Sequence, residues 1–219
     1  MPARTITGLG PAVCEQAGAG GRLLSTQPWR ARLGLSLSDA PEMFDLDYWL
    51  ADPTIRVAHA RESTSAPEHL WRSAASVGLN DARLLGRLVR WRIPGLAVDL
   101  SFHNLFQHDP FLVLDGEQEL GLMSGLVGRI WTLRRDYPQL SDPDEFRLWH
   151  RSGTARVLFA NWVEPSASGG AVLRSETRVH AIGAQARLGM AGLRPLVRAF
   201  QQLIASDGIE EAVRRAEAT

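Results

Sequence analysis

GAVLRSETRVHAI (170–182) decides the fold of this chain, because it has the alternation of a strand and is followed directly by a segment of helical period. From Ala184 onward, apolar residues recur at the spacing of one helix face: Leu188, Ala191, Leu196, Phe200 and Leu203. Pro195 removes one backbone hydrogen bond and predicts a kink. Ser206-Asp207-Gly208 predicts a break before a short polar helix, IEEAVRRAEA. The C-terminal part is therefore predicted to be a strand followed by a long amphipathic helix.

The segments before this strand predict an antiparallel sheet. TARVLFANWVEP (154–165) is predicted to be a strand that turns through SASGG into 170–182. FLVLDGEQELGLMSGLVGRIW (111–131) predicts two strands around a turn at Asp115-Gly116, with glycines that suit a curved sheet. Strands in series with helices kept apart from them are typical of an α+β fold rather than of a parallel α/β sheet.

Further upstream, IRVAHARES (55–63) is predicted to be the first strand of the domain. A helix should follow in SAPEHLWRSAASVG, because Ser65 and Glu68 have the spacing of a capping box and Pro67 suits the first turn. Asn80 or Asp81 can cap a second short helix through LLGRLVRWR. Between these helices and the next strand, SFHNLFQHDP (101–110) is predicted to be a loop or an irregular strand.

Three of these stretches resemble the START-like helix-grip superfamily (SRPBCC, the polyketide cyclase/dehydrase and lipid-transport proteins). They are SAPEHLWRSAASV, GLMSGLVGRIW and VLRSETRVHAIGAQAR, and the resemblance covers roughly residues 53–217. It implies a curved antiparallel β-sheet wrapped around a long C-terminal α-helix, with two short helices after the first strand. The superfamily contains carriers, cyclases, hydrolases and sensors, so the resemblance implies a fold more than a function. Gly189 and Gly192 depart from the regular helix that it implies.

The composition suggests three regions and a soluble setting. Residues 1–28 are rich in small residues and are predicted to be a flexible arm, residues 29–52 an aromatic-rich covering segment, and residues 53–219 the START-like ligand-binding domain. A net charge of zero disfavours nucleic acid as a partner, and no stretch is long and apolar enough for a membrane span. The single cysteine and the absence of a signal peptide predict a cytoplasmic protein. All basic side chains are arginine, which indicates a GC-rich bacterial genome.

The direction of the charged row in 170–182 stays open. Leu173, Ser175, Thr177 and Val179 share one face of this strand, and Arg174, Glu176, Arg178 and His180 share the other. The charged row either solvates the outside of the sheet or forms a polar wall of the cavity beneath the helix. Strand 154–165 is apolar on both faces, which suggests that both are covered, one of them by the 29–52 segment.

Candidate site residues follow from this predicted cavity. Aromatic, polar and apolar side chains on the strands and the last helix are candidates for ligand binding: Trp131, Trp149, Phe159, Asn161, Trp162, Ser175, Thr177, Leu196 and Phe200. The candidate catalytic residues are His150, Arg174 and Glu176. His103, His108 and Asp109 match no regular ligand spacing, so we expect no metal, and no motif indicates a cofactor.

The function predicted from these features is binding of a hydrophobic small molecule, lipid-like or polyketide-like, between the sheet and the C-terminal helix. The alternative is a cofactor-independent cyclase, or a related non-redox enzyme of natural-product biosynthesis, that acts in the same cavity. Besides this ligand, a second copy of the chain in a homodimer is left open as a partner.

Overall fold

The computed structural model describes residues 44–81, 86–87, 89–90, 95, 97, 99–115, 119–132, 134, 136–167, 169–192 and 208–218. All of them fall in the second of the two units into which the chain divides, Ala40–Thr219. The predicted arm, most of the predicted covering segment, Leu196, Phe200, the kink at Pro195 and the break at Ser206-Asp207 lie outside the described residues.

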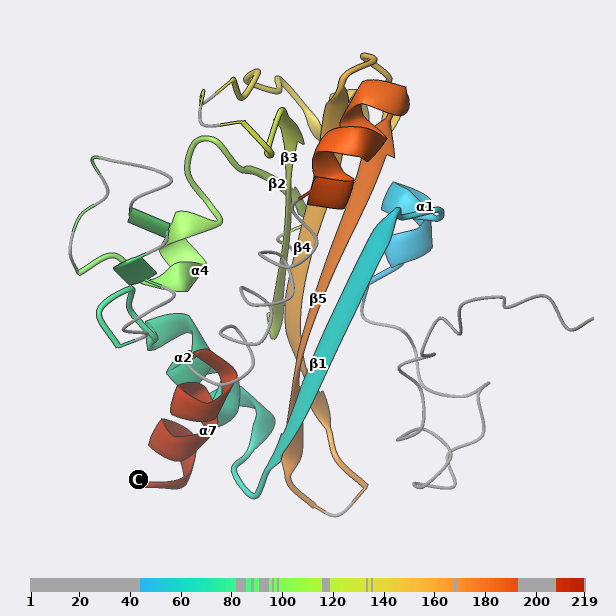
Figure 1. Cartoon of the computed structure of the whole chain (residues 1–219). Helices are drawn as coiled ribbons and strands as arrows, with labels where there is room; N and C mark the ends of the chain where they lie inside the picture. Colours follow the sequence, from blue (N-terminus) through green and yellow to red (C-terminus); the bar gives the residue numbers. More distant parts are fainter. Residues whose placement is uncertain are drawn as a thin grey trace, which may run out of the picture. The chain divides into compact units, whose positions relative to one another are not determined.

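Five antiparallel strands form one sheet with the order β1-β5-β4-β3-β2 (Figure 1). The strands are β1 (Ile55–Ser63), β2 (Leu112–Asp115), β3 (Gly121–Gly128), β4 (Thr154–Pro165) and β5 (Ala171–Ile182). β1 and β4 have the predicted bounds, and β5 begins one residue later than predicted. The predicted α+β class with an antiparallel sheet is confirmed, and the arrangement is consistent with a helix-grip fold.

Helices cover the sheet on both faces. They are α1 (Leu46–Leu50), α2 (Pro67–Ser76), α4 (Phe102–Leu105), α5 (Pro143–Leu148) and α7 (Glu210–Glu217), and residues 184–192 are also helical. Of the second predicted helix, residues 86–87 and 89–90 are helical. Figure 1 shows α2, α4 and α7 on one side of the sheet and α1 on the other.

The first of these faces, which we call the α7 face, carries two apolar clusters. At one end, Ala186 and Met190 of the helical residues 184–192 pack on Val157 and Val179. At the other end, α2 and α7 pack on Val163 and Leu173. The two helical segments that flank residues 193–207 therefore lie over opposite ends of this face.

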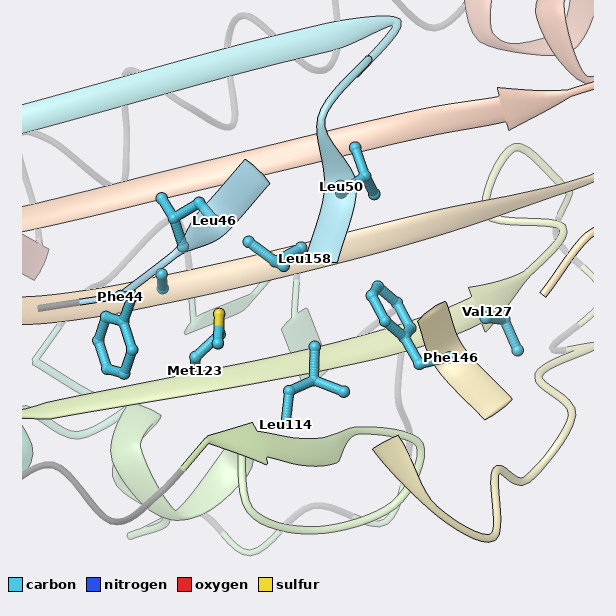
Figure 2. Close-up of a cluster of buried hydrophobic side chains, with 9 residues drawn as sticks. Phe44, Leu46, Leu50, Leu114, Met123, Val127, Phe146 and Leu158 are labelled. Atoms are coloured by element: carbon cyan, nitrogen blue, oxygen red, sulfur yellow. The ribbon is translucent and has the colours of Figure 1, made fainter. Parts of the chain in front are cut away.

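The second face, which we call the α1 face, has its own apolar cluster (Figure 2). Phe44, Leu46 and Leu50 pack with Leu158 of β4, and Phe146 of α5 joins them, with exposed fractions of 6 % or less. Gly125 of β3 faces this cluster, because a Cβ at this position would lie 2.7 Å from the Phe146 ring. Both faces of β4 are thus covered, which explains why its sequence is apolar at odd and even positions alike.

Two local predictions are wrong. Ser65 does not cap α2: the cap is Ala66 without a side-chain bond, and the Ser65 hydroxyl instead donates to the Ala216 carbonyl at 2.7 Å. A tertiary contact has replaced the expected local one. The segment predicted to be a loop or an irregular strand contains α4, because Ser101 Oγ accepts from the Asn104 backbone N–H and begins a helical turn.

Candidate functional site

The centre of the α7 face holds polar side chains between the two apolar clusters. The register places Asn161 opposite Ser175 and Phe159 opposite Thr177, so these four side chains share one face of β4 and β5. Residues of β1 and β3 continue these two cross-strand pairs on the same face. We call the set the central band, and it consists of Val57, His59, Leu122, Ser124, Phe159, Asn161, Ser175 and Thr177.

The packing changes at this band. Val157 and Val179 on one side of it, and Val163 and Leu173 on the other, are 5 % exposed or less. Within the band, Phe159, Asn161 and Thr177 are only half-buried although they lie in the middle strands of the sheet. The described helices therefore close over the ends of the α7 face and leave the centre less tightly covered.

Several polar side chains of the central band lack hydrogen-bond partners among the described residues, unlike the charged side chains on the α1 face. Among the described residues, the Ser124 hydroxyl meets no hydrogen-bond partner although Ser124 is only 1 % exposed. The side chains of Asn161, Ser175 and Thr177 also form no hydrogen bond within the described part of the chain. Asn161 and Thr177 are half-buried, so of these four side chains it is the Ser124 hydroxyl that is both shielded from solvent and unpaired within the described residues. Buried polar groups are normally paired, so this hydroxyl indicates capacity for a bound molecule.

Phenylalanine rings border the band on the side of α4 and β2. The Phe159 ring lies 5.0 Å from Phe106 and 5.7 Å from Phe111, and the latter two rings are 5.1 Å apart. All three residues are half-buried. An aromatic group could pack against their exposed parts edge-to-face or offset, as aromatic pairs prefer.

The structure brings four of the predicted ligand-binding residues together in the central band: Phe159, Asn161, Ser175 and Thr177. Trp131 lies on the same face but at its end, where it contacts the helical residues 184–192 at Gly189. Trp149 and Trp162 lie on the α1 face, where Trp149 donates to Thr154 Oγ1 and Trp162 donates to Glu164.

Two predicted catalytic residues, Arg174 and Glu176, do not face this band. They alternate with Ser175 along β5, so their side chains lie on the α1 face. Arg174 pairs with Glu164 there. His150 is exposed in the segment after α5, and its Nδ1 lies 3.0 Å from the Leu148 carbonyl. Of the two directions left open for the charged row, the polar wall of the α7 face is therefore ruled out for Arg174 and Glu176.

The charged row is not a simple solvated surface either. Glu176 is 5 % exposed and Arg178 3 % exposed. Arg178 Nε donates to Glu176 at 2.6 Å, and its Nη1 donates to the Leu50 carbonyl at 2.8 Å and to Asp47. Burial lowers the pKa of Arg178, but hydrogen bonds from its guanidinium to Glu176 and Asp47 outweigh this effect and raise the pKa above its ordinary value. This row holds α1 on the sheet.

Sequence reasoning missed Ser124, Phe106 and Phe111 as candidate site residues. In GLMSGLVG every residue of β3 is buried, so alternation alone did not show which side chains belong to which face. One signal was present: Ser124 is the only polar side chain in that run of apolar residues and glycines.

Two observations bear on other classes of site. In the part of the chain that the structure describes, no group of three or more His, Cys, Asp or Glu side chains could hold a metal ion. No described helix has the length and apolar character needed to cross a membrane.

Comparisons with known proteins add structural likeness only. No family model and no curated protein matches the chain. Among solved structures, protein MLL2253 from Mesorhizobium loti is 17% identical, with 74% of this chain and 98% of that chain covered and a TM-score of 0.33. Ara h 8.0201 is 9% identical (71% and 98% covered, TM-score 0.29), and norcoclaurine synthase from Thalictrum flavum is 12% identical (78% and 98%, TM-score 0.23). At these TM-scores the likenesses carry no argument about what this chain binds.

Proposed function

We propose that this protein binds a hydrophobic small molecule against the central band of the α7 face. The observation that carries the proposal is a group of polar side chains without hydrogen-bond partners among the described residues, Ser124, Asn161, Ser175 and Thr177, at the centre of a face whose two ends are apolar. A purely structural sheet face would be expected to carry apolar residues or paired polar residues at these positions.

The composition of the band suits a ligand that is mainly apolar. The half-buried Val57 and Phe159 offer apolar surface, and burial of apolar area contributes about 25 cal/mol per Å². A ligand that loses ~250 Å² of apolar surface would gain about 6 kcal/mol, from which the cost of association is subtracted. The hydroxyl and amide groups beside this surface would fix the orientation of the ligand more than its affinity.

A cyclase activity is not advanced, since Arg174 and Glu176, two of the three side chains predicted to polarise a substrate, lie on the α1 face. The binding proposal needs neither of them.

The neutral fluorescent probe N-phenyl-1-naphthylamine tests the proposal with two matched variants. Thr177→Trp places a large ring in the central band, whereas Ala58→Trp places the same ring on the α1 face of the adjacent strand, where Ala58 is exposed. We expect the wild type to bind the probe, Thr177→Trp to weaken binding at least tenfold, and Ala58→Trp to change it less than twofold. Far-UV circular dichroism checks that both variants fold.

Two results would overturn the proposal. One is a wild-type protein that does not bind the probe at any concentration up to its solubility limit. The other is equal affinity in the two folded variants, which would place the bound probe away from the central band.

A further inference from the structure

We infer that the Ser124 hydroxyl is the anchor for a hydroxyl or carbonyl group on a neutral aromatic ligand. The inference rests on the proposed function and adds the chemical class of the molecule and the residue that selects it.

Ser124 stands in apolar surroundings on its own face. The register places it opposite Phe159 of β4 on one side and opposite Val113 of β2 on the other. Along β3, the next residues on the same face are Leu122 and Leu126, which are 3 % and 6 % exposed. A serine at the centre of four apolar neighbours loses its hydration and gains nothing from packing, so it opposes stability there.

No hydrogen bond replaces the lost hydration of this hydroxyl in the described part of the chain, since no partner lies within hydrogen-bonding distance of Ser124 Oγ. Buried hydroxyls usually have a hydrogen-bond partner, as the Ser63 hydroxyl does in donating to Glu217. A hydroxyl can both donate and accept, so a phenol and a ketone are equally able to satisfy it.

The aromatic part of the inference comes from Phe159 and its neighbours. Phe159 is the cross-strand partner of Ser124, and its ring contacts those of Phe106 and Phe111. Because Ser124 itself is buried, a ligand reaches the hydroxyl by displacing the half-buried Phe159 ring rather than by opening the close-packed clusters at the ends of the face. An aromatic ligand would contact the rings of Phe106 and Phe111 in place of the displaced Phe159 ring.

The neutral character follows from the position of the charges. No Asp, Glu or Arg belongs to the central band, and the charged residues of β5 are on the α1 face. His59 of β1 is the titratable side chain of the band and lies three strands away from Ser124, so a charged ligand group beside Ser124 would lack a counter-ion within the band and would lose its hydration.

The test uses two probes of similar size, 2-naphthol and 2-methylnaphthalene, and titrates each into the wild type and Ser124→Ala. We expect the wild type to favour 2-naphthol by about 2- to 10-fold, the usual worth of one net hydrogen bond. Ser124→Ala should remove that preference and leave the affinity for 2-methylnaphthalene within twofold.

Thermal unfolding of the free protein gives an independent readout. Ser124→Ala removes an unpaired hydroxyl, so its Tm should stay equal or rise by about 2–4 °C. The matched control Ser65→Ala removes a hydroxyl that is hydrogen-bonded to Ala216, so its Tm should fall. If Ser124 had a purely structural role, Ser124→Ala would lower the Tm as Ser65→Ala does.

The outcomes separate this inference from the proposed function. If the wild type binds both probes equally, or Ser124→Ala lowers the Tm as Ser65→Ala does, the anchor is refuted while binding at the central band stands. If neither probe binds the wild type, the proposed function and the anchor both fail.

Discussion

Replacement of Glu176 by alanine should destabilise the protein strongly, because Glu176 neutralises a buried arginine. Glu176 accepts from Arg178 Nε at 2.6 Å and from Arg56 Nη2 at 3.1 Å. The side chains of Arg178 and Glu176 are 4% and 6% exposed. Without Glu176, the charged partner that the buried guanidinium keeps among the described side chains is Asp47, which is 74% exposed.

The magnitude follows from this burial. Removal of one partner from a buried ion pair costs about 3–5 kcal/mol, because the other charge stays buried without compensation. In a domain of this size about 1 kcal/mol shifts the Tm by about 2–4 °C, so Glu176→Ala should lower it by roughly 6–20 °C. Glu176→Gln keeps an acceptor and should lower the Tm less.

One arginine variant and one aspartate variant provide the controls. Arg56→Ala and Asp47→Ala remove partners whose own side chains are 49% and 74% exposed, so each should lower the stability less than Glu176→Ala does. The double variant Glu176→Leu/Arg178→Met removes both buried charges and should recover most of the stability lost in Glu176→Ala.

Urea unfolding followed by tryptophan fluorescence measures these differences at constant pH. A loss of less than about 1 kcal/mol in Glu176→Ala would refute the buried-pair argument, since that is the range of an exposed pair. The same variant, studied below its unfolding transition, should bind N-phenyl-1-naphthylamine with wild-type affinity, because Glu176 lies on the α1 face. A loss of binding in folded Glu176→Ala would contradict the assignment of the two faces.

Two further predictions concern the helical residues 184–192 and α4. Gly189→Ala should lower the Tm, because a Cβ there would lie 2.6 Å from Trp131 Cδ1, whereas Gly192→Ala has nothing within 4 Å and should stabilise the helix by up to about 1 kcal/mol. Equal effects of the two substitutions would show that the Trp131 ring does not pack on Gly189. Burial lowers the pKa of His103 below its ordinary value of 6.5, so the unfolded chain binds this proton more tightly than the folded chain does. The free energy of unfolding should therefore fall as the pH drops from 6.5 through the folded pKa, and His103→Gln should reduce that slope in urea titrations at several pH values; an unchanged slope would contradict the assignment.

Much of the fold could be predicted because strands and helices leave local periods in the sequence. The bounds of β1 follow from alternation and those of β4 from a run of apolar residues, in both cases together with the turn residues that flank them. The short helices α4 and α5 were harder, because each depends on one capping residue, Ser101 and Asp142, rather than on an apolar period.

The candidate site was predictable only in part. Ser175 and Thr177 were grouped because alternation shows which residues of one strand share a face. Phe159 and Asn161 were named together with Trp162 of the opposite face, because alternation does not orient a strand that is apolar on both sides. Ser124 was not identified, because its membership of the central band depends on the register of β3 against β4. The side on which Arg174 and Glu176 lie stayed open, because an alternating pattern does not say which of its two faces a distant helix will cover.

The sequence by itself therefore determined the order of the elements, the antiparallel sheet and the grouping of Ser175 with Thr177 against Arg174 with Glu176 in strand 170–182. Only the tertiary structure decided which group faces α7. The deciding contacts join residues far apart in the chain: Arg178 donates to Asp47 across 131 positions, and α7 packs on Leu173 at the other face. Local periodicity records that a side chain is covered, whereas the identity of the covering element is set by long-range packing.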